Sequence, residues 1–177
     1  RRALALRGLR GGGAVYLGRS GGRSWDQGRY GGPYQRDLLM QMGAMVETLE
    51  TSQTWSDLSR LHSAVGTAIR DSLAAGGTPG LVFCHLSHAY ADGASLYFTF
   101  ISRARAGAEI EQWGEVKSAA CEAIVANGAT ITHHHAVGRD HAPYMKAEVG
   151  EAGLEVLRAI KQQLDPAGIM NPGKLLS

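Results

Sequence analysis

Apolar residues recur at intervals of three or four positions in three stretches of the chain. The first stretch follows Thr54 and contains Trp55, Leu58, Leu61, Val65, Ile69 and Leu73. This spacing places them on one side of a helix and predicts a packing helix that stops at Gly76-Gly77. The same pattern predicts helices over about 111–126, before Asn127-Gly128, and over about 148–164, before Asp165-Pro166.

A run of β-suited residues over 45–51 predicts a strand with polar groups on both faces. Alternation places Glu47, Leu49 and Thr51 on one face and Val46, Thr48 and Glu50 on the other. A buried strand rarely carries polar groups on both sides. The pattern is ordinary for an edge strand or for a strand that lines a cleft.

Two further strands are predicted over 81–90 and 95–102. The turn residues Ala91-Asp92-Gly93-Ala94 join them, which indicates a β-hairpin. Alternation gives one shared face to Val82, Cys84, Leu86 and His88 in the first strand, and one to Tyr97, Thr99 and Ile101 in the second. A tyrosine in such a position is more often a packing residue than a catalyst.

The order of these elements predicts an α+β fold in which an antiparallel sheet carries helices packed on one face. The other face would be free to cover a ligand or another domain. Residues 1–32 are rich in Gly and Arg and are expected to be mostly loop, with one short strand at Ala14–Leu17.

The composition fits one globular domain of 177 residues, 44% of them apolar, with a net charge of +2. The first 36 residues contain eight arginines and one acid, Asp26, whereas the rest contains ten bases and fifteen acids. Lysine clusters and RNA-binding signatures are absent from this arginine-rich part, so no nucleic-acid partner is expected. An anionic small ligand or an acidic neighbouring domain accounts equally well for the arginines.

The two cysteines, Cys84 and Cys121, lie within apolar segments, which favours free thiols and a reducing, cytoplasmic setting. Peripheral association with a membrane is a second expectation for the location. No run of 18 apolar residues and no signal peptide is visible. The chain begins at Arg1 rather than Met, so we expect it to be a fragment of a longer protein.

Three consecutive histidines, His133, His134 and His135, are the strongest candidates for chemistry. In an extended strand His133 and His135 would share one face and His134 the other, so the three could not converge on one ion. No metal site is therefore expected. The imidazoles are either solvated at a strand end, or they donate hydrogen bonds to an anion or a cofactor near neutral pH.

Several longer motifs together carry a family resemblance. They are Pro33-Tyr34-Gln35-Arg36-Asp37, residues 46–52 followed by Trp55, residues 93–100, residues 133–138, Leu164-Asp165-Pro166 and Asn171-Pro172-Gly173-Lys174. From about Arg29 to the end, the chain resembles the C-terminal part of alkyldihydroxyacetonephosphate synthases, which are FAD-linked flavoproteins of the vanillyl-alcohol-oxidase class. The Asn-Pro-Gly-Lys tail is typical of FAD-linked oxidases broadly, and the triple histidine points to the synthase subgroup.

This resemblance implies a two-domain flavoprotein of which the chain is the C-terminal part only. Residues 33–135 would be the cap, or substrate, domain, and residues 1–32 a connector. Residues 136–177 would be a helix and tail that return to the FAD-binding domain, which lies outside this chain. The implied partners are that domain and a lipid or hydroxy-acid substrate, and a homodimer is left open.

The implied reaction replaces the acyl group of acyl-dihydroxyacetone phosphate with a fatty alcohol. By the same resemblance Tyr97 would be the general acid/base, assisted by His133, His134 and His135. Arg36 and Thr48 would bind the substrate. His134, His135 and Asn171 would contact the FAD.

Other functions remain open at this stage. The tail is closer to bacterial FAD-linked oxidases, and His85, His88 and His141 have no assigned role. An FAD-dependent 2-hydroxy-acid or alcohol dehydrogenase is therefore the alternative, because such enzymes share a fold and differ in chemistry. A non-catalytic interaction domain is the third reading.

Overall fold

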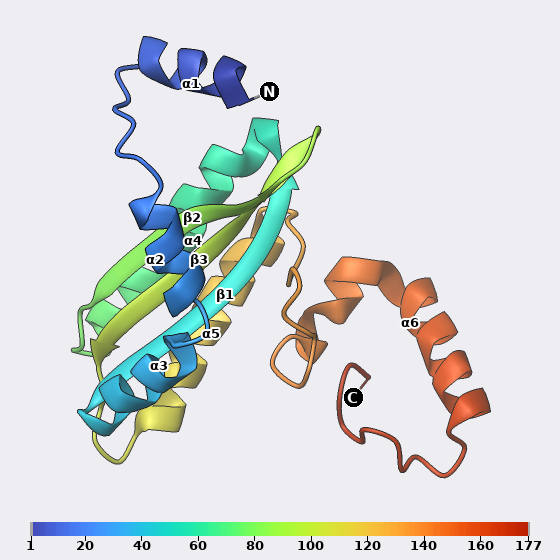
Figure 1. The fold of residues 1–177 in the computed structure, drawn as a ribbon. Coiled ribbons are helices and arrows are strands. Elements are labelled where there is room, and N and C mark those ends of the chain that lie inside the picture. The colour runs from blue at the N-terminus through green and yellow to red at the C-terminus, as the bar shows by residue number, and fades with distance from the viewer. Residues whose placement is uncertain (1, 177) are drawn as a thin grey trace. The chain divides into compact units, whose positions relative to one another are not determined.

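Three antiparallel strands form a sheet in the order β1-β3-β2 (Figure 1). The strands are β1 (Ala44–Thr54), β2 (Leu81–Ala89) and β3 (Gly93–Arg103). This computed structural model describes residues 2–176, except the side chains of residues 2 and 33, and the chain divides into two compact units, residues 1–38 and 39–177. The sheet belongs to the second unit, and β1 is an edge strand, as its polar pattern predicts.

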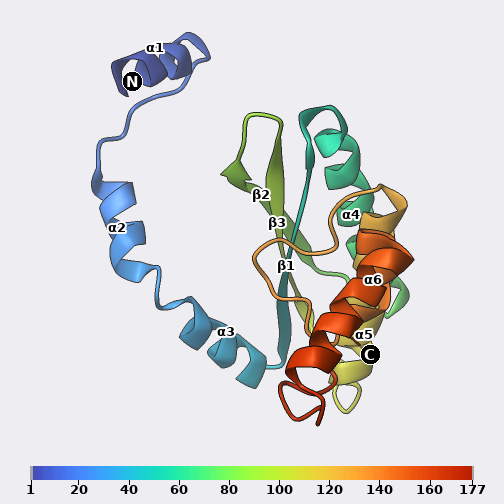
Figure 2. The same cartoon turned by 90° about the vertical axis from the view of Figure 1, so that its right-hand side faces the viewer.

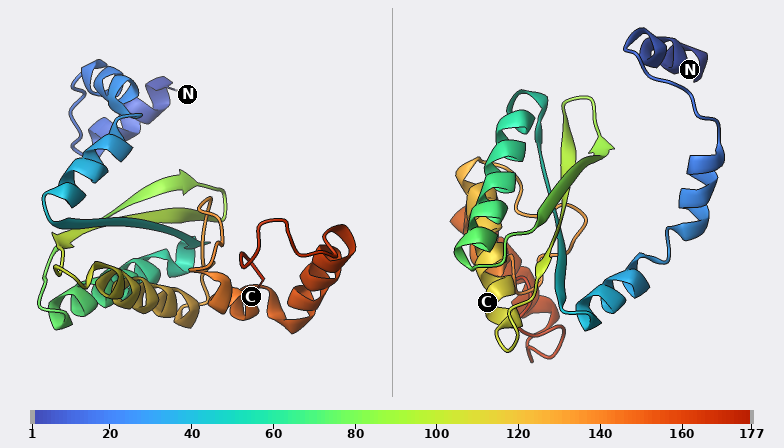
Figure 3. Two further views of the ribbon diagram at one scale, coloured as in Figure 1. Left: turned by 90° about the horizontal axis from the view of Figure 1, so that it is seen from below. Right: turned by 90° about the vertical axis from the view of Figure 1, so that its left-hand side faces the viewer.

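Two long helices, α4 (Trp55–Ala75) and α5 (Glu109–Ala126), lie side by side against one face of the sheet (Figures 2 and 3). Between the helices and the sheet lies an apolar core whose fully buried members include Leu61, Val65, Ile69, Phe98 and Phe100. The predicted α+β architecture, with helices on one face, is confirmed. Trp55 differs from its predicted inward position, because it remains 45% exposed and its indole N–H donates to the carbonyls of Tyr90 and Ala91.

A buried glutamine joins the second helix to the sheet and to the preceding turn. The Gln112 side chain donates to the Thr78 hydroxyl at 2.8 Å and to the Arg103 carbonyl at 2.9 Å, and it accepts from the Arg105 amide at 2.8 Å. Because both ends of the buried amide have partners, its desolvation is offset and it fixes the start of α5 beside the end of β3.

Strand register separates the sheet into a face covered by the helices and an opposite face, the open face. Leu49 lies opposite Phe98 under the helices, whereas Glu50 lies opposite Tyr97 on the open face. Tyr97, Thr99 and Ile101 share the open face, as alternation predicts. Between Leu86 and Ala89 the pairing with β3 shifts by one residue, which marks a β-bulge.

This bulge corrects one prediction from alternation. Val82, Cys84 and Leu86 pair with helix-facing residues of β3, so they keep the face predicted for them. One extra residue reverses the alternation that follows, which turns His88 to the open face. The physical reason is the period of two along a strand, since a single insertion inverts every later side chain.

Residues 129–138, the histidine loop, form no strand, in contrast to the extended segment expected there. The loop runs along the outer edge of β1, where the amide of Thr130 donates to the carbonyl of Ser52 at 3.3 Å and that of His133 to Glu50 at 3.0 Å. The hydroxyl of Thr51 donates to the carbonyl of Thr130 at 2.6 Å. His134 has a φ of 61°, and this left-handed residue interrupts a regular ladder.

The last part of the chain, residues 142–176, follows the histidine loop and contacts it again through the tail. A short 3-10 helix, η1 (Ala142–Tyr144), leads into α6 (Met145–Leu164), which starts three residues before the predicted helix and is interrupted at Gly150. The buried Asp165 carboxylate accepts the amides of Ile169 and Met170, each at 3.0 Å. The amide of Leu175 then donates to the carbonyl of Gly138 at 2.9 Å, so the tail fastens the exit of the histidine loop.

The buried His141 side chain also stabilises the histidine loop. It is 6% exposed, its Nδ1 lies 3.2 Å from the carbonyl of Ala136, and its amide donates to the carbonyl of Val137 at 3.1 Å. Burial lowers its pKa, the charges of Lys117 and His135 lower it further, and the Ala136 bond and Asp140 oppose the shift. This histidine, which has no role at the level of sequence, is a neutral packing residue that shapes the loop.

The first unit contradicts the prediction of a loop-rich segment with one short strand. It contains α1 (Arg2–Gly11), α2 (Ser20–Gly28) and most of α3 (Gly32–Gln41), and residues 14–17 form no strand. Ala, Leu and Arg are strong helix formers and outweigh the scattered glycines in α1. The β-suited residues 14–17 have no partner strand to pair with. Within residues 2–176 no helix is long and apolar enough to cross a membrane.

Replacing Gly93 with alanine should destabilise the sheet by about 2–4 kcal/mol, measured by denaturant unfolding. A Cβ at this position would lie 2.3 Å from the Gln53 carbonyl oxygen, where β3 pairs with β1, so the backbone would have to move. Gly114→Ala is the matched control. Its Cβ would meet nothing within 4 Å on α5, so it should stabilise by roughly 0.5–1 kcal/mol. Equal effects of both variants would contradict the close approach.

The buried His141 predicts a pH dependence of stability. Its pKa is lowered on folding from the ordinary 6.5, so the unfolded chain binds the proton more readily. The stability it contributes is complete above pH 6.5 and is lost as the pH falls below this value. Equilibrium unfolding of His141→Gln, which keeps an N–H donor without a titrating group, should show a shallower loss of stability below pH 6.5 than the unmodified protein. Identical slopes would show that His141 is not the responsible group.

Candidate functional site

One row of side chains across the open face forms the centre of the site. Glu50 on β1, Tyr97 on β3 and His85 on β2 are direct neighbours in the strand register. The His85 ring stacks on Tyr97 with centroids 5.1 Å apart, and His135 from the histidine loop meets the tyrosine edge-on at 5.3 Å. Tyr97 therefore stands between two imidazoles and beside a carboxylate.

Glu50 is buried at this point, with 4% of the residue exposed. The Ser95 hydroxyl donates to its Oε1 at 2.7 Å, while Nδ1 of His133 lies 3.3 Å from Oε1 and Nε2 of His135 lies 3.6 Å from Oε2. Burial by itself raises the pKa of Glu50, but hydrogen bonds from Ser95 and Ser87 and the neighbouring His133 outweigh it, so the pKa lies below its ordinary value. The site thus contains a buried, ionised carboxylate.

Sequence reasoning gave Glu50 no role. Alternation placed Glu50 on the same face as Thr48. A carboxylate on a strand with polar groups on both faces was the one sequence feature that could have suggested a functional role for Glu50. What singles it out is the pairing with Tyr97 and the approach of two histidines from a loop that follows more than 80 residues later in the chain, which no local pattern records.

His133 bridges Glu50 and a tyrosine. Its Nε2 lies 3.1 Å from the hydroxyl of Tyr90, and its Nδ1 is within ion-pair distance of Glu50 although the pair is not aligned as a hydrogen bond. A proton on Nδ1, facing the carboxylate, would leave Nε2 free to accept the tyrosine O–H. We assign this tautomer from the two partners.

His134 is exposed. Its ring meets that of His133 at 4.3 Å and that of His88 at 4.7 Å between centroids. His133 and His135 both approach Glu50, as their predicted shared face requires, but His134 does not diverge from His133 as a regular strand would make it, because the backbone is a loop with a left-handed residue.

The remaining predicted residues lie in different places. Thr48 is on the open face opposite Thr99, one row from Tyr97. Arg36 belongs to the first unit, so its role in phosphate binding stays a prediction. Asn171 lies on the tail with a φ of 47°, where it helps to line an apolar groove of about 310 Å³ between α6 and the chain end. Its contact with FAD also stays a prediction.

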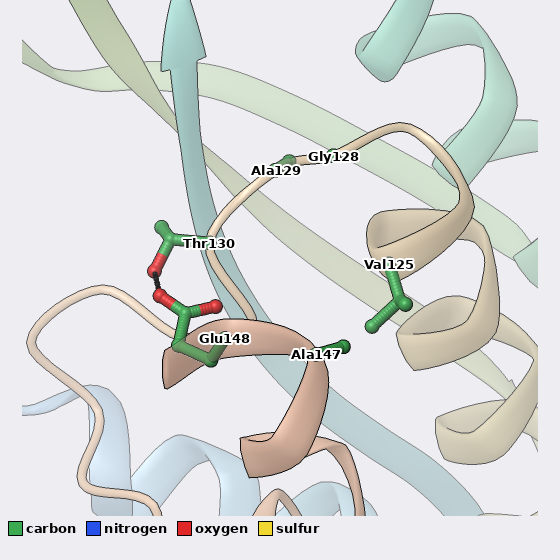
Figure 4. Close-up of a pocket in the computed structure, with 6 residues that line it drawn as sticks. All are labelled: Val125, Gly128, Ala129, Thr130, Ala147 and Glu148. Atoms are coloured by element: carbon green, nitrogen blue, oxygen red, sulfur yellow. Dashed lines mark hydrogen bonds between the residues drawn. The ribbon is translucent and has the colours of Figure 1, made fainter. Parts of the chain in front are cut away.

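A second pocket, of about 190 Å³, lies behind the histidine loop between α5 and α6 (Figure 4). Its polar side chains, Thr130 and Glu148, are hydrogen-bonded to each other, and Glu148 also accepts the Ile131 amide at 2.8 Å. These bonds fasten the loop to the start of α6. Because these hydrogen bonds use the polar groups of Thr130 and Glu148, the two side chains stabilise the loop and leave the pocket few groups that could bind a ligand.

The open face suits a flat aromatic cofactor. Leu81 and Phe83 on β2 are exposed by 61% and 53% and pair with Ile101 and Thr99, which share the open face with Tyr97. The imidazole of His135 from the histidine loop lies against Tyr97 on the same face. Apolar and aromatic side chains can pack against an isoalloxazine ring, and imidazole N–H groups can donate to negative charge on it. The residues present therefore fit the redox-active end of FAD.

Comparison with known proteins agrees with this fit. Residues 17–175 match the family described as FAD linked oxidases, C-terminal domain. The chain is 35% identical over 164 residues to alkyldihydroxyacetonephosphate synthase of Trypanosoma brucei brucei and 32% identical over 163 residues to that of Dictyostelium discoideum. These matches cover 93% and 92% of the chain but 27% of each relative.

A solved structure of alkyldihydroxyacetonephosphate synthase has the same fold, with a TM-score of 0.61 and 25% identity over 85% of this chain and 24% of that one. Glycolate oxidase subunit GlcD of Bacillus subtilis is 33% identical over 94 residues, which are 53% of this chain and 20% of that protein. The expected flavoprotein resemblance is confirmed, and FAD is the cofactor of the family. The chain belongs to the FAD-linked oxidases and corresponds to their C-terminal domain.

Proposed function

We propose that this chain is the substrate-side part of a flavoenzyme that exchanges the acyl group of an acyl-dihydroxyacetone phosphate for a fatty alcohol. The observation that carries the proposal is the row Glu50–Tyr97–His85 with His135 above it, on an open face that fits a flavin. The names of the relatives from Trypanosoma and Dictyostelium support this choice of reaction. The chain spans 27% of their length, so the complete activity needs the rest of the protein.

In this proposal Tyr97 holds and moves the proton of the substrate carbon at its phenolic oxygen. His85 stacks on the Tyr97 ring and His135 meets it edge-on, so the two imidazoles hold the ring in place on the open face. Bound FAD would supply the electron-accepting ring at which the substrate reacts. The buried Glu50 holds His133 and His135 in place, and ring N–H groups of His134 and His135 would donate to negative charge that develops on the substrate.

The remaining roles follow from residue chemistry. Arg36 would bind the phosphate through a forked, charge-assisted contact, and the Thr48 hydroxyl would contact the substrate next to Tyr97. Residues 33–135 would act as the cap and residues 136–177 as the segment that returns to the FAD-binding domain, with residues 1–32 as connector. Asn171 would meet FAD from the tail.

The similarity to a glycolate oxidase subunit favours a second candidate, an FAD-dependent 2-hydroxy-acid dehydrogenase. The two functions differ in their redox balance, because the exchange reaction is redox-neutral and the dehydrogenase passes electrons to an acceptor. A non-catalytic interaction domain is the third candidate and requires neither flavin nor turnover.

The test uses the longest natural protein that contains this chain, loaded with FAD. An acyl-dihydroxyacetone phosphate should bleach the flavin absorbance without reduction of an artificial acceptor, and a fatty alcohol should then yield the ether product. Bleaching by 2-hydroxy acids with steady acceptor reduction would replace the first candidate by the second. Full-length protein that binds no flavin would favour the third.

Replacing Tyr97 with phenylalanine should lower kcat for ether formation by roughly 10²–10⁴-fold, because the variant keeps the ring contacts and loses the hydroxyl that moves the proton. Flavin content and the unfolding midpoint should stay unchanged. The control is Thr99→Ser, on the same strand and the same face, which should retain activity. Full activity of Tyr97→Phe would remove the tyrosine from the mechanism.

A further inference from the structure

Three imidazole rings cluster where the bulge of β2 meets the histidine loop. The ring centroids of His88, His133 and His134 are separated by 4.3, 4.7 and 5.3 Å, and one nitrogen of each lies within 4.8 Å of one from each of the others. His88 and His134 are exposed and His133 is half-buried, so the cluster is open to solvent on one side. Among residues 2–176 this is the group of side chains whose donor atoms lie close enough together to be a candidate metal site.

Adjacent histidines in a regular strand diverge and could not bind one ion, but the histidine loop is not a strand. The positive φ of His134 bends the backbone so that its ring meets that of His133, and the bulge turns His88 to the same face. The third ligand, His88, comes from strand β2, 45 residues before His133, which ligand spacing within the loop could not reveal.

We propose that His88, His133 and His134 bind one divalent transition-metal ion of the zinc type. Neutral imidazoles are ligands for Zn²⁺, Co²⁺, Ni²⁺ and Cu²⁺, whereas Mg²⁺ and Ca²⁺ prefer oxygen. Three protein nitrogens leave a fourth position of a tetrahedral ion for water or a substrate oxygen, as in zinc sites that take part in reactions.

The surroundings of His133 match those of a metal ligand. Metal-binding histidines commonly hold a carboxylate at the ring nitrogen that does not face the ion, and Nδ1 of His133 lies 3.3 Å from the buried Glu50. The other nitrogen, Nε2, then carries the lone pair, which now meets the hydroxyl of Tyr90 at 3.1 Å. An ion would take this lone pair in place of the tyrosine O–H.

Binding requires the rings to move closer together. Ligand nitrogens about 2.1 Å from a tetrahedral zinc ion are roughly 3.4 Å apart, compared with separations of up to 4.8 Å in this cluster. Side-chain rotation of the exposed His88 and His134 can supply this change, while Glu50 and the backbone bond from His133 to β1 hold the third ligand.

A metal ion bound by His88, His133 and His134 would also change the roles of the histidines in the proposed reaction. This inference rests on the proposed function. With an ion bound, His133 and His134 are ligands, so His135 and Tyr97 remain for hydrogen bonding and proton transfer. The open coordination position would face an anionic oxygen of the substrate. Metal binding itself needs neither flavin nor turnover, so the two proposals can fail separately.

The test is a titration of the full chain, produced without a polyhistidine tag and freed of metal by a chelator, with Co²⁺ alone. We expect saturation at one equivalent with the visible bands of four-coordinate cobalt, and displacement of the cobalt by Zn²⁺. His88→Ala removes an exposed ligand and should weaken Zn²⁺ binding, measured against a chromophoric chelator, by at least about a hundredfold.

His62→Ala is the matched control, since it removes an exposed imidazole on α4 outside the cluster and should leave Zn²⁺ affinity unchanged. Glu50→Gln keeps the ligands but loses the carboxylate, and it should weaken binding by about 10–100-fold. Circular dichroism establishes that each variant is folded. Absence of saturable binding, or equal affinities of the His88 and His62 variants, would overturn the proposal.

Discussion

A buried carboxylate needs hydrogen bonds or a countercharge, and Glu50 obtains both from elements that are far apart in the sequence. Ser95 on the central strand donates to it, and His133 and His135 approach it from a loop. Without these partners a buried negative charge would be strongly unfavourable, so Glu50 ties the sheet and the histidine loop into one arrangement. The positions of His133 and His135 follow from this constraint.

The loop keeps that arrangement because it is held on all sides by ordinary contacts. Backbone bonds attach it to β1, Glu148 attaches its start to α6, His141 fills its inside, and the returning tail bonds to Gly138. The three consecutive histidines are therefore carried by a scaffold of hydrogen bonds rather than by regular secondary structure. Such a scaffold allows a left-handed residue, which a strand would not.

The sheet divides packing from chemistry. Its helix-covered face carries the apolar core, and its open face carries tyrosine, imidazoles, a carboxylate and exposed apolar side chains. One face thus holds the domain together, and the other is free to meet cofactor and substrate in the proposed function. A transition-metal ion at the bulged end of β2 would add an electrophile to that second face.

The sequence by itself determined the helices over 55–75 and 111–126, the hairpin, the edge strand and the identity of the histidine run. Those features depend on local periodicity and turn residues, which one stretch of chain contains in full. The sequence also pointed to Tyr97 and the family through its motifs. It did not predict the helices within residues 2–28, because the many glycines there suggested a loop despite good helix formers.

Only the tertiary structure decided that Glu50 is the partner of His133 and His135, and that His88 joins His133 and His134. The bulge that turns His88 and the left-handed turn at His134 arise from pairing between distant segments, and no pattern within either segment encodes that pairing.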